Sequence, residues 1–167
     1  MRLFFACWPP AETAQALGRW AAEVRNESGG KLTPVENVHL TLAFLGEADP
    51  GAAIGAARAV EGRRQALPVD AARYVKRNRM VWVGPATPPA PLHALAADLH
   101  ASLRRAGFAL EERPFAAHVT LIRNARRPAA IPPLPSVSWP VEEFLLISSR
   151  TSPTGSVYSP VERFALR

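Results

Sequence analysis

A short phrase that joins a histidine to a threonine occurs twice in the chain, at residues 39–42 (HLTL) and 118–121 (HVTL). In an extended strand, side chains alternate between the two faces, so the histidine and the threonine of each copy share one face. The two apolar residues of each copy share the other face, which can be buried. The imidazole and the hydroxyl of one copy start roughly 6.6 Å apart along the strand, close enough to contact one phosphate group.

Two such copies carry the groups that cleavage of a phosphodiester requires. Histidine has an unperturbed pKa of about 6.5, so it gives or takes a proton near neutrality. One of His39 and His118 can act as the general base and the other as the general acid, and each role contributes about 10²–10⁴ in rate. The sequence does not say which histidine has which role. The hydroxyls of Thr41 and Thr120 can donate to phosphate oxygens, and a hydrogen bond to a charged group contributes about 1.5–3 kcal/mol.

A single copy consists of ordinary strand residues, so the elements around the two copies decide the interpretation. A strand and a helix with an apolar stripe are predicted before each histidine, in the same order and at nearly the same distance. In the first half, the predicted elements are a strand at 2–8, a helix at 10–28 ended by Gly29, and the strand with His39. A helix at 50–66, with Ile54, Ala57, Val60 and Ala66 inward, and a hairpin of 68–76 and 79–83 lead into the second half, which continues with a helix at 91–106 and the strand with His118. An irregular stretch at 127–140 follows, and then strands at 144–147 and 157–164 around a turn at 151–156.

This order predicts an α+β fold built by a duplication. Residues 1–167 are expected to form a single domain. The strands favour antiparallel sheets, with the helices packed outside them.

Composition sets the broad class of the protein. Apolar residues make up 48% of the chain and charged residues 20%, as in a globular domain, and no apolar run approaches the roughly 20 residues of a membrane helix. The apolar start of the chain ends at Pro9 and Pro10, which argues against a signal peptide. Cys7 is the only cysteine. From these two observations, a cytoplasmic location is expected. The net charge of +6 favours an anionic partner, nucleic acid above all.

Other chemistries are less well supported. The polar faces of the predicted strands with His39 and His118 carry no carboxylate, and Glu36 and Glu47 are interpreted as lying outside these strands, so no metal site is expected. No cofactor is expected either. No Gly-rich loop of the ATP-binding type and no serine nucleophile elbow occurs. His93 and His100 lie beside the apolar stripe of a predicted helix and are interpreted as boundary residues of the core. Cys7 lies in an apolar strand and is interpreted as a core residue.

Residues 37–46 (NVHLTLAFLG) and 115–123 (FAAHVTLIR) resemble the two signatures of the RNA 2′,3′-cyclic phosphodiesterase family, historically called 2′-5′ RNA ligases. That family belongs to the two-histidine phosphoesterase superfamily. The resemblance extends to residues 2–6 and 149–158, and so over nearly the whole chain. One departure is Ala117, because the family commonly has proline before the second histidine. We expect it to loosen the entry to the strand more than to change the chemistry.

The resemblance implies a bilobal, pseudo-twofold fold in which each lobe contributes one histidine strand to a central cleft. It implies metal-free, ATP-independent opening of a terminal RNA 2′,3′-cyclic phosphate to a 2′-phosphate, with weak reverse 2′-5′ joining. A monomer is expected, because nothing in the sequence demands more than one chain. By matching position, Phe44 and Arg123 are expected to bind the terminal nucleoside, since an aromatic ring stacks on a base and a guanidinium pairs with phosphate. Tyr158 is expected near the cleft. Other basic residues that could follow the RNA backbone are Lys31, Lys76, Arg77, Arg79, Arg126, Arg127 and Arg150.

Three alternatives stay open at this point. The substrate could be a small nucleotide cyclic phosphate, such as an ADP-ribose 1″,2″-cyclic phosphate. The chain could instead be a module that binds RNA ends without catalysis, although the second complete copy of histidine and threonine argues against this. An enzyme that acts chiefly in the joining direction is disfavoured, because the chain has no motif for nucleotide activation.

Overall fold

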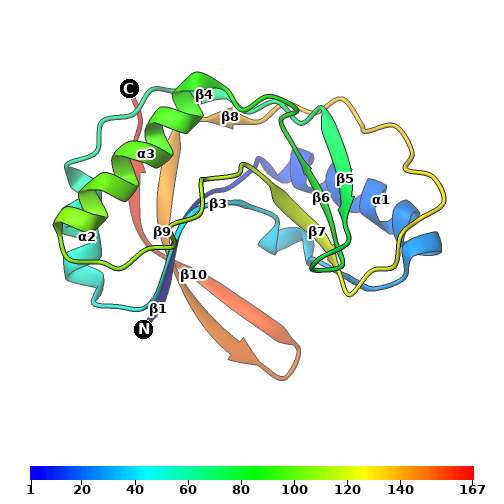
Figure 1. Ribbon diagram of the computed structural model, residues 1–167, viewed down its shortest axis with the longest axis horizontal. Coiled ribbons are helices and arrows are strands. Elements are labelled where there is room, and N and C mark those ends of the chain that lie inside the picture. Colours follow the sequence, from blue (N-terminus) through cyan, green and yellow to red (C-terminus); the bar gives the residue numbers. More distant parts are fainter.

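The computed structural model describes residues 1–167 and is an α+β fold with three antiparallel sheets (Figure 1). The helices are α1 (Ala11–Ser28), α2 (Pro50–Arg58) and α3 (Ala90–Arg105), with a short 3₁₀ helix η1 (Val35–Asn37). The strands are β1 (Arg2–Cys7), β2 (Lys31–Leu32), β3 (Leu40–Glu47), β4 (Gln65–Ala66), β5 (Ala71–Val75), β6 (Met80–Gly84), β7 (Val119–Arg123), β8 (Pro140–Val141), β9 (Glu143–Ser152) and β10 (Gly155–Ala165). The predicted fold class is confirmed.

The two larger sheets each contain one of the histidine strands. The first sheet has the order β10-β9-β1-β3, and the second has the order β2-β7-β6-β5. His39 directly precedes β3 and His118 directly precedes β7. Strands β3 and β7 contact each other, so the two histidine strands meet where the sheets come together. The third sheet is a short pair of β4 and β8.

Each long helix packs against the sheet of the other half. Helix α1 connects β1 to β3 in the first sheet but contacts β7 and β2 of the second, and α3 connects β6 to β7 in the second sheet but contacts β3 of the first. Figure 1 shows α1 on the right beside β5, β6 and β7, and α3 on the left beside β9. The two halves are therefore interlocked, and a single hydrophobic cluster runs through both.

The long helices form where their apolar stripes predict them. The buried face of α1 includes Leu17, Trp20 and Val24, and the helix ends at Gly29 with a φ of 60°. The buried face of α3 carries four leucines, each almost fully inaccessible to solvent: Leu92, Leu95, Leu99 and Leu103. Burial of a leucine side chain contributes about 1.5–3 kcal/mol, so these stripes fix each helix on its sheet.

The predicted helix at 50–66 is wrong beyond residue 58. The helix does not continue, because residues 62–64 form backbone hydrogen bonds with Arg167 instead. Arg64 N–H donates to the carbonyl of Arg167, and Arg167 N–H donates to the carbonyl of Gly62. A side chain at Gly62 would lie 2.8 Å from Leu166 and 2.9 Å from Leu95. Ala66, expected to face inward from this helix, is exposed in β4.

The two predicted hairpins are present, with different lengths. The pairing of β5 with β6 runs from Ala71 opposite Gly84 to Val75 opposite Met80, and the turn occupies residues 76–79. Strands β9 and β10 are longer than predicted, since their pairing continues to Ser152 and Gly155 and leaves only residues 153–154 for the turn. No helix has the length and apolarity that crossing a membrane requires.

Candidate active site

The His39 ring is fixed by two hydrogen bonds. Its Nδ1 lies 2.6 Å from the carbonyl oxygen of Asn37, and its Nε2 lies 3.0 Å from the hydroxyl of Thr41. A carbonyl can only accept, so Nδ1 carries the hydrogen in the neutral ring and Nε2 is the basic nitrogen. The contact with Thr41 confirms that His39 and Thr41 share one face of the strand.

The His118 ring is held in the same way. Its Nδ1 lies 2.8 Å from the carbonyl oxygen of Ala116, again two residues earlier, so its Nε2 is also the basic nitrogen. No hydrogen bond joins this Nε2 to Thr120, which lies one residue into β7. Because the anchor is a backbone carbonyl, it does not depend on the type of residue at position 117.

Each histidine also lies against a tryptophan. Trp8 directly follows β1, and Trp82 lies in β6. The rings of Trp8 and His39 are stacked, with centroids 4.8 Å apart and planes 12° apart. The rings of Trp82 and His118 are stacked at 4.0 Å and 20°. Trp82 is the cross-strand partner of Thr120. These tryptophans limit rotation of the imidazoles and lend a π face to the charged form.

The sequence reasoning did not find the two tryptophans. The signal that could have found them is their place in, or directly after, the strand that precedes each long helix, because that strand pairs with the histidine strand of the same half. The stacking depends on the register between strands, which the sequence pattern does not supply.

Both histidines are held in their neutral form in the free protein. Burial lowers the pKa of His39 to about 4, with further lowering by the charges of Arg123 and His118, against a smaller raising effect of the Asn37 carbonyl. Burial also lowers the pKa of His118, again with a contribution from Arg123 and against the Ala116 carbonyl. The charge of Arg123 thus lowers the pKa of both rings. The strands that follow the two histidines, β3 and β7, contact each other, so both rings lie where the two sheets meet.

The residues expected to bind the nucleoside lie around His39 and at the end of β7. Phe44 is 65% exposed, and its ring lies 5.9 Å from that of Phe4, which in turn lies 5.1 Å from His39. The exposed ring is available to stack with a base, and it is not a core residue. Tyr158 approaches His39 edge-on at 5.5 Å. Arg123 ends β7, is exposed and forms no ion pair.

The remaining histidines and the cysteine have other surroundings. His100 donates from Nε2 to the carbonyl of Leu42 at 2.7 Å, and His93 is exposed on α3. His100 fits the interpretation as a boundary residue of the core, whereas His93 is a surface residue. Burial raises the pKa of Cys7 to about 12, so its thiol stays protonated and is a poor nucleophile. Nowhere do three His, Cys, Asp or Glu side chains gather in a way that could hold a metal ion.

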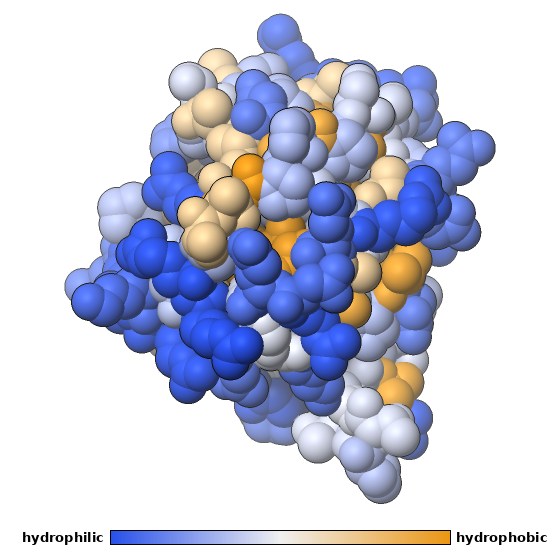
Figure 2. Space-filling view, turned by 90° about the vertical axis from the view of Figure 1, so that its right-hand side faces the viewer, coloured by the Kyte–Doolittle hydropathy of each residue, from blue (hydrophilic) through white to orange (hydrophobic).

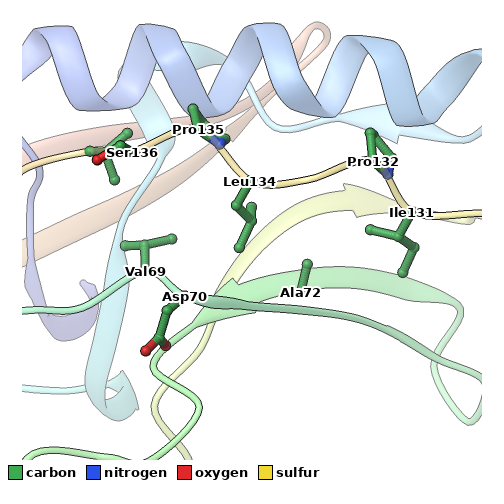
Figure 3. A pocket seen from close by; sticks show the side chains of 9 residues that line it. Val69, Asp70, Ala72, Ile131, Pro132, Leu134, Pro135 and Ser136 are labelled. Carbon is green, nitrogen blue, oxygen red and sulfur yellow. The ribbon is translucent and has the colours of Figure 1, made fainter.

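A hollow of about 700 Å³ lies away from the histidines, between the edge strand β5 and residues 131–137 (Figure 3). Figure 3 shows aliphatic side chains such as Leu134 and Ile131 directed toward Ala72. The ionisable residue in its lining, Asp70, accepts a hydrogen bond from the backbone of Ala86 at 2.7 Å. The hollow thus offers no acid–base pair, and the candidate site remains the one formed by the histidine strands.

A site with two imidazoles, two hydroxyls and a free guanidinium is suited to phosphate ester chemistry. A family model described as LigT-like phosphoesterase matches the chain twice, at residues 8–82 and 83–158. Each match contains one histidine–threonine phrase, which supports the predicted duplication.

The chain is similar to curated proteins over its full length. It is 36% identical to the RNA 2′,3′-cyclic phosphodiesterase of Escherichia coli, covering 99% of this chain and 96% of that protein. It is 34% identical to the protein of the same name from Thermus thermophilus, covering 100% and 91%. Its fold matches the crystal structure of E. coli LigT complexed with 3′-AMP with a TM-score of 0.91 at 36% identity, over 99% and 97% of the two chains.

The chain therefore belongs to the LigT-like phosphoesterase family. Membership confirms the resemblance drawn from the two signatures. It also supports the prediction of an enzyme that hydrolyses phosphoric diesters.

Proposed function

We propose that the protein opens the 2′,3′-cyclic phosphate at the 3′ end of RNA and leaves a 2′-phosphomonoester. The observation that carries this proposal is the matched pair of imidazoles, each with Nδ1–H bound to a carbonyl and with Nε2 as the basic nitrogen. Two curated relatives are named for this activity, and a related structure is a complex with 3′-AMP, a nucleotide with a phosphate on its ribose.

In the proposed reaction, His39 and His118 are the acid–base pair. One neutral imidazole takes a proton from water at Nε2 while the water oxygen bonds to phosphorus. The bond from phosphorus to the 3′ oxygen breaks. The other imidazole, which takes up a proton at Nε2 when the anionic phosphate lies beside it, donates that proton to the 3′ oxygen. The product has a 3′ hydroxyl and a 2′-phosphate, and no metal ion or nucleotide cofactor takes part.

The other site residues bind the phosphate and the nucleoside. The hydroxyls of Thr41 and Thr120 donate to the non-bridging oxygens, whose negative charge is spread in the transition state. In the complex, the single hydrogen of the Thr41 hydroxyl therefore turns from Nε2 of His39 to the phosphate. Arg123 is a charged partner for the same phosphate. The exposed ring of Phe44 stacks on the terminal base, a contact that contributes about 1–3 kcal/mol. We propose that one chain suffices, because all of these residues belong to it.

The same geometry permits a weak reverse reaction. If the 5′ hydroxyl of another RNA replaces water as the nucleophile, the same bond to the 3′ oxygen breaks and a 2′-5′ linkage forms. Water is far more abundant than RNA ends, so hydrolysis dominates.

The test uses an oligonucleotide that ends in a 2′,3′-cyclic phosphate. We expect a 2′-monoester as product, no effect of a metal chelator, and a loss of at least about 10²-fold in kcat when either His39→Ala or His118→Ala is introduced. His93→Ala serves as the matched control, because this histidine is exposed on α3 and lies outside the site.

Several outcomes would contradict the proposal. A folded double variant of His39 and His118 with normal activity would exclude the acid–base assignment. Opening of small cyclic nucleotides with no action on RNA ends would favour the alternative substrate class. Binding of RNA ends without turnover in any buffer would favour a binding module.

A further inference from the structure

The second sheet and the segment that follows it carry cations but no carboxylates. No Asp or Glu occurs among residues 71–97 or 113–141, which contain β5, β6 and β7. Six exposed basic side chains there, called the basic surface from here on, are Arg73, Lys76, Arg77, Arg79, Arg126 and Arg127. None of them forms an ion pair. Figure 2 shows this end of the molecule, where hydrophilic side chains surround a small apolar area.

Tertiary contacts bring these cations together from two parts of the chain. Arg79 accepts a hydrogen bond at its carbonyl from Ala125 N–H, at 2.9 Å, and donates from Nε to the Ala125 carbonyl, at 3.4 Å. The guanidinium of Arg127 lies 5.2 Å from the centre of the Tyr74 ring. The β5–β6 turn and the residues after β7 are thus fixed to each other. A cluster of unpaired like charges raises the energy of the folded state, and a bound anion would offset that cost.

The basic surface begins beside the active site. Arg73 is the cross-strand partner of Trp82, whose ring stacks on His118. Cross-strand partners share one face of a sheet, so Arg73 lies on the face that carries the site. Strand β5 is two strands from β7, a separation of about 10 Å.

A second connection runs along the end of β7. Arg123, which acts electrostatically on both imidazoles, lies opposite Lys31 of β2. Arg126 follows it three residues later, and its backbone N–H donates to the carbonyl of Ser28. Cations therefore occur from the site to the far end of the second sheet, where the carboxylate of Glu27 in α1 accepts a hydrogen bond from Ala130 N–H at 3.5 Å.

We propose that the basic surface binds the phosphate backbone of the RNA strand on the 5′ side of the reacting end. This inference rests on the proposed function, because the reacting end must then lie between the histidines and the strand must leave from there. Exposed cations recognise phosphates without reading bases, so the contribution is independent of sequence. The enzyme should accordingly prefer an oligonucleotide end over a cyclic mononucleotide, which is too short to reach the β5–β6 turn.

The test compares two double variants that remove the same charge. Arg73→Gln with Arg77→Gln neutralises the basic surface at two exposed residues whose side chains form no hydrogen bond within the protein. The matched control is Arg63→Gln with Arg105→Gln, two exposed arginines outside the second sheet. The substrates are an octanucleotide with a 2′,3′-cyclic phosphate end and the corresponding cyclic mononucleotide, over a series of salt concentrations.

We expect the first double variant to lower the ratio of the two kcat/KM values, octanucleotide over mononucleotide, by about tenfold or more at 0.1 M salt. The slope of log kcat/KM against log salt for the octanucleotide should become less negative by about 1.4, or 0.7 for each lost contact. The control variant should keep the wild-type ratio and slope.

Two results would overturn the inference. Wild-type protein could show equal kcat/KM and salt dependence for both substrates, or the two double variants could behave alike; the surface would then serve another anionic partner, such as an acidic protein. A binding measurement separates this failure from failure of the proposed function. An octanucleotide with a 2′-phosphate end should bind more weakly to the first double variant than to the control, even if the wild-type protein opens no cyclic phosphate.

Discussion

At the scale of single residues, the site depends on rings that are held in one orientation. The alternation of side chains along a strand predicted the pairing of His39 with Thr41, and the hydrogen bond between them confirms it. The tryptophans were not predicted, because stacking depends on the register between strands. Trp82 makes no hydrogen bond at its buried Nε1, so the stacking of its ring on His118 is the contact that links it to the site. We infer that Trp82 is a positioning residue for His118.

This role predicts a specific kinetic effect of Trp82→Ala. Without the indole, the imidazole can rotate and is less buried, so kcat should fall by about 10- to 100-fold, since small misplacements carry costs of this size. The burial that lowers the pKa of His118 should also be relieved, and the corresponding limb of the kcat/KM profile should move to higher pH. The measurement is a pH–rate profile of both variants, with Trp82→Phe expected to restore most of the activity. A loss of stability without a shift of the pH–rate profile would show that Trp82 has a structural role only.

At the scale of elements, the position of Arg123 depends on a close approach of two backbones. Gly30 precedes β2 and has a φ of 92°, and a side chain there would overlap the carbonyl oxygen of Arg123. The glycines after α1 were predicted from the sequence as the end of a helix. The close approach of β7 that Gly30 allows was not predictable. It arises because α1 packs on the sheet of the other half, and the sequence pattern does not indicate this packing.

The close approach predicts that Gly30→Ala is more harmful than the same change at Gly107. Both glycines have a left-handed backbone, with φ values of 92° and 96°, but a side chain at Gly107 would meet no atom within 4 Å. Gly107→Ala should therefore cost about 1–2 kcal/mol from backbone strain alone. Gly30→Ala should cost about 1–3 kcal/mol more, because the backbones must move apart. Urea unfolding of both variants measures the difference, and equal free energies of unfolding would show that the contact carries no cost.

At the scale of the whole molecule, the sequence predicted the charge but not its distribution. The net charge of +6 indicated an anionic partner, and several residues of the basic surface were singled out as possible backbone contacts. Their position relative to the histidines follows from the pairing of β5, β6 and β7, which only the fold supplies. The same interlocked fold buries His39 between the sheets, and this burial couples the stability of the entire domain to pH.

The coupling has a definite sign. The pKa of His39 is about 4 in the folded protein and about 6.5 in the unfolded chain, so between these values the unfolded chain binds the extra proton. Stability is therefore complete above pH 6.5 and is lost as the pH falls toward 4, by about 3 kcal/mol for this residue. In His39→Gln this loss is absent, so the variant should lose less free energy of unfolding than the wild type between pH 7.5 and pH 4, while the exposed His93→Gln should follow the wild type. Urea unfolding at a series of pH values measures all three proteins. An identical pH dependence in all three would mean that His39 is solvated in the free enzyme, and its neutral form would then need another cause.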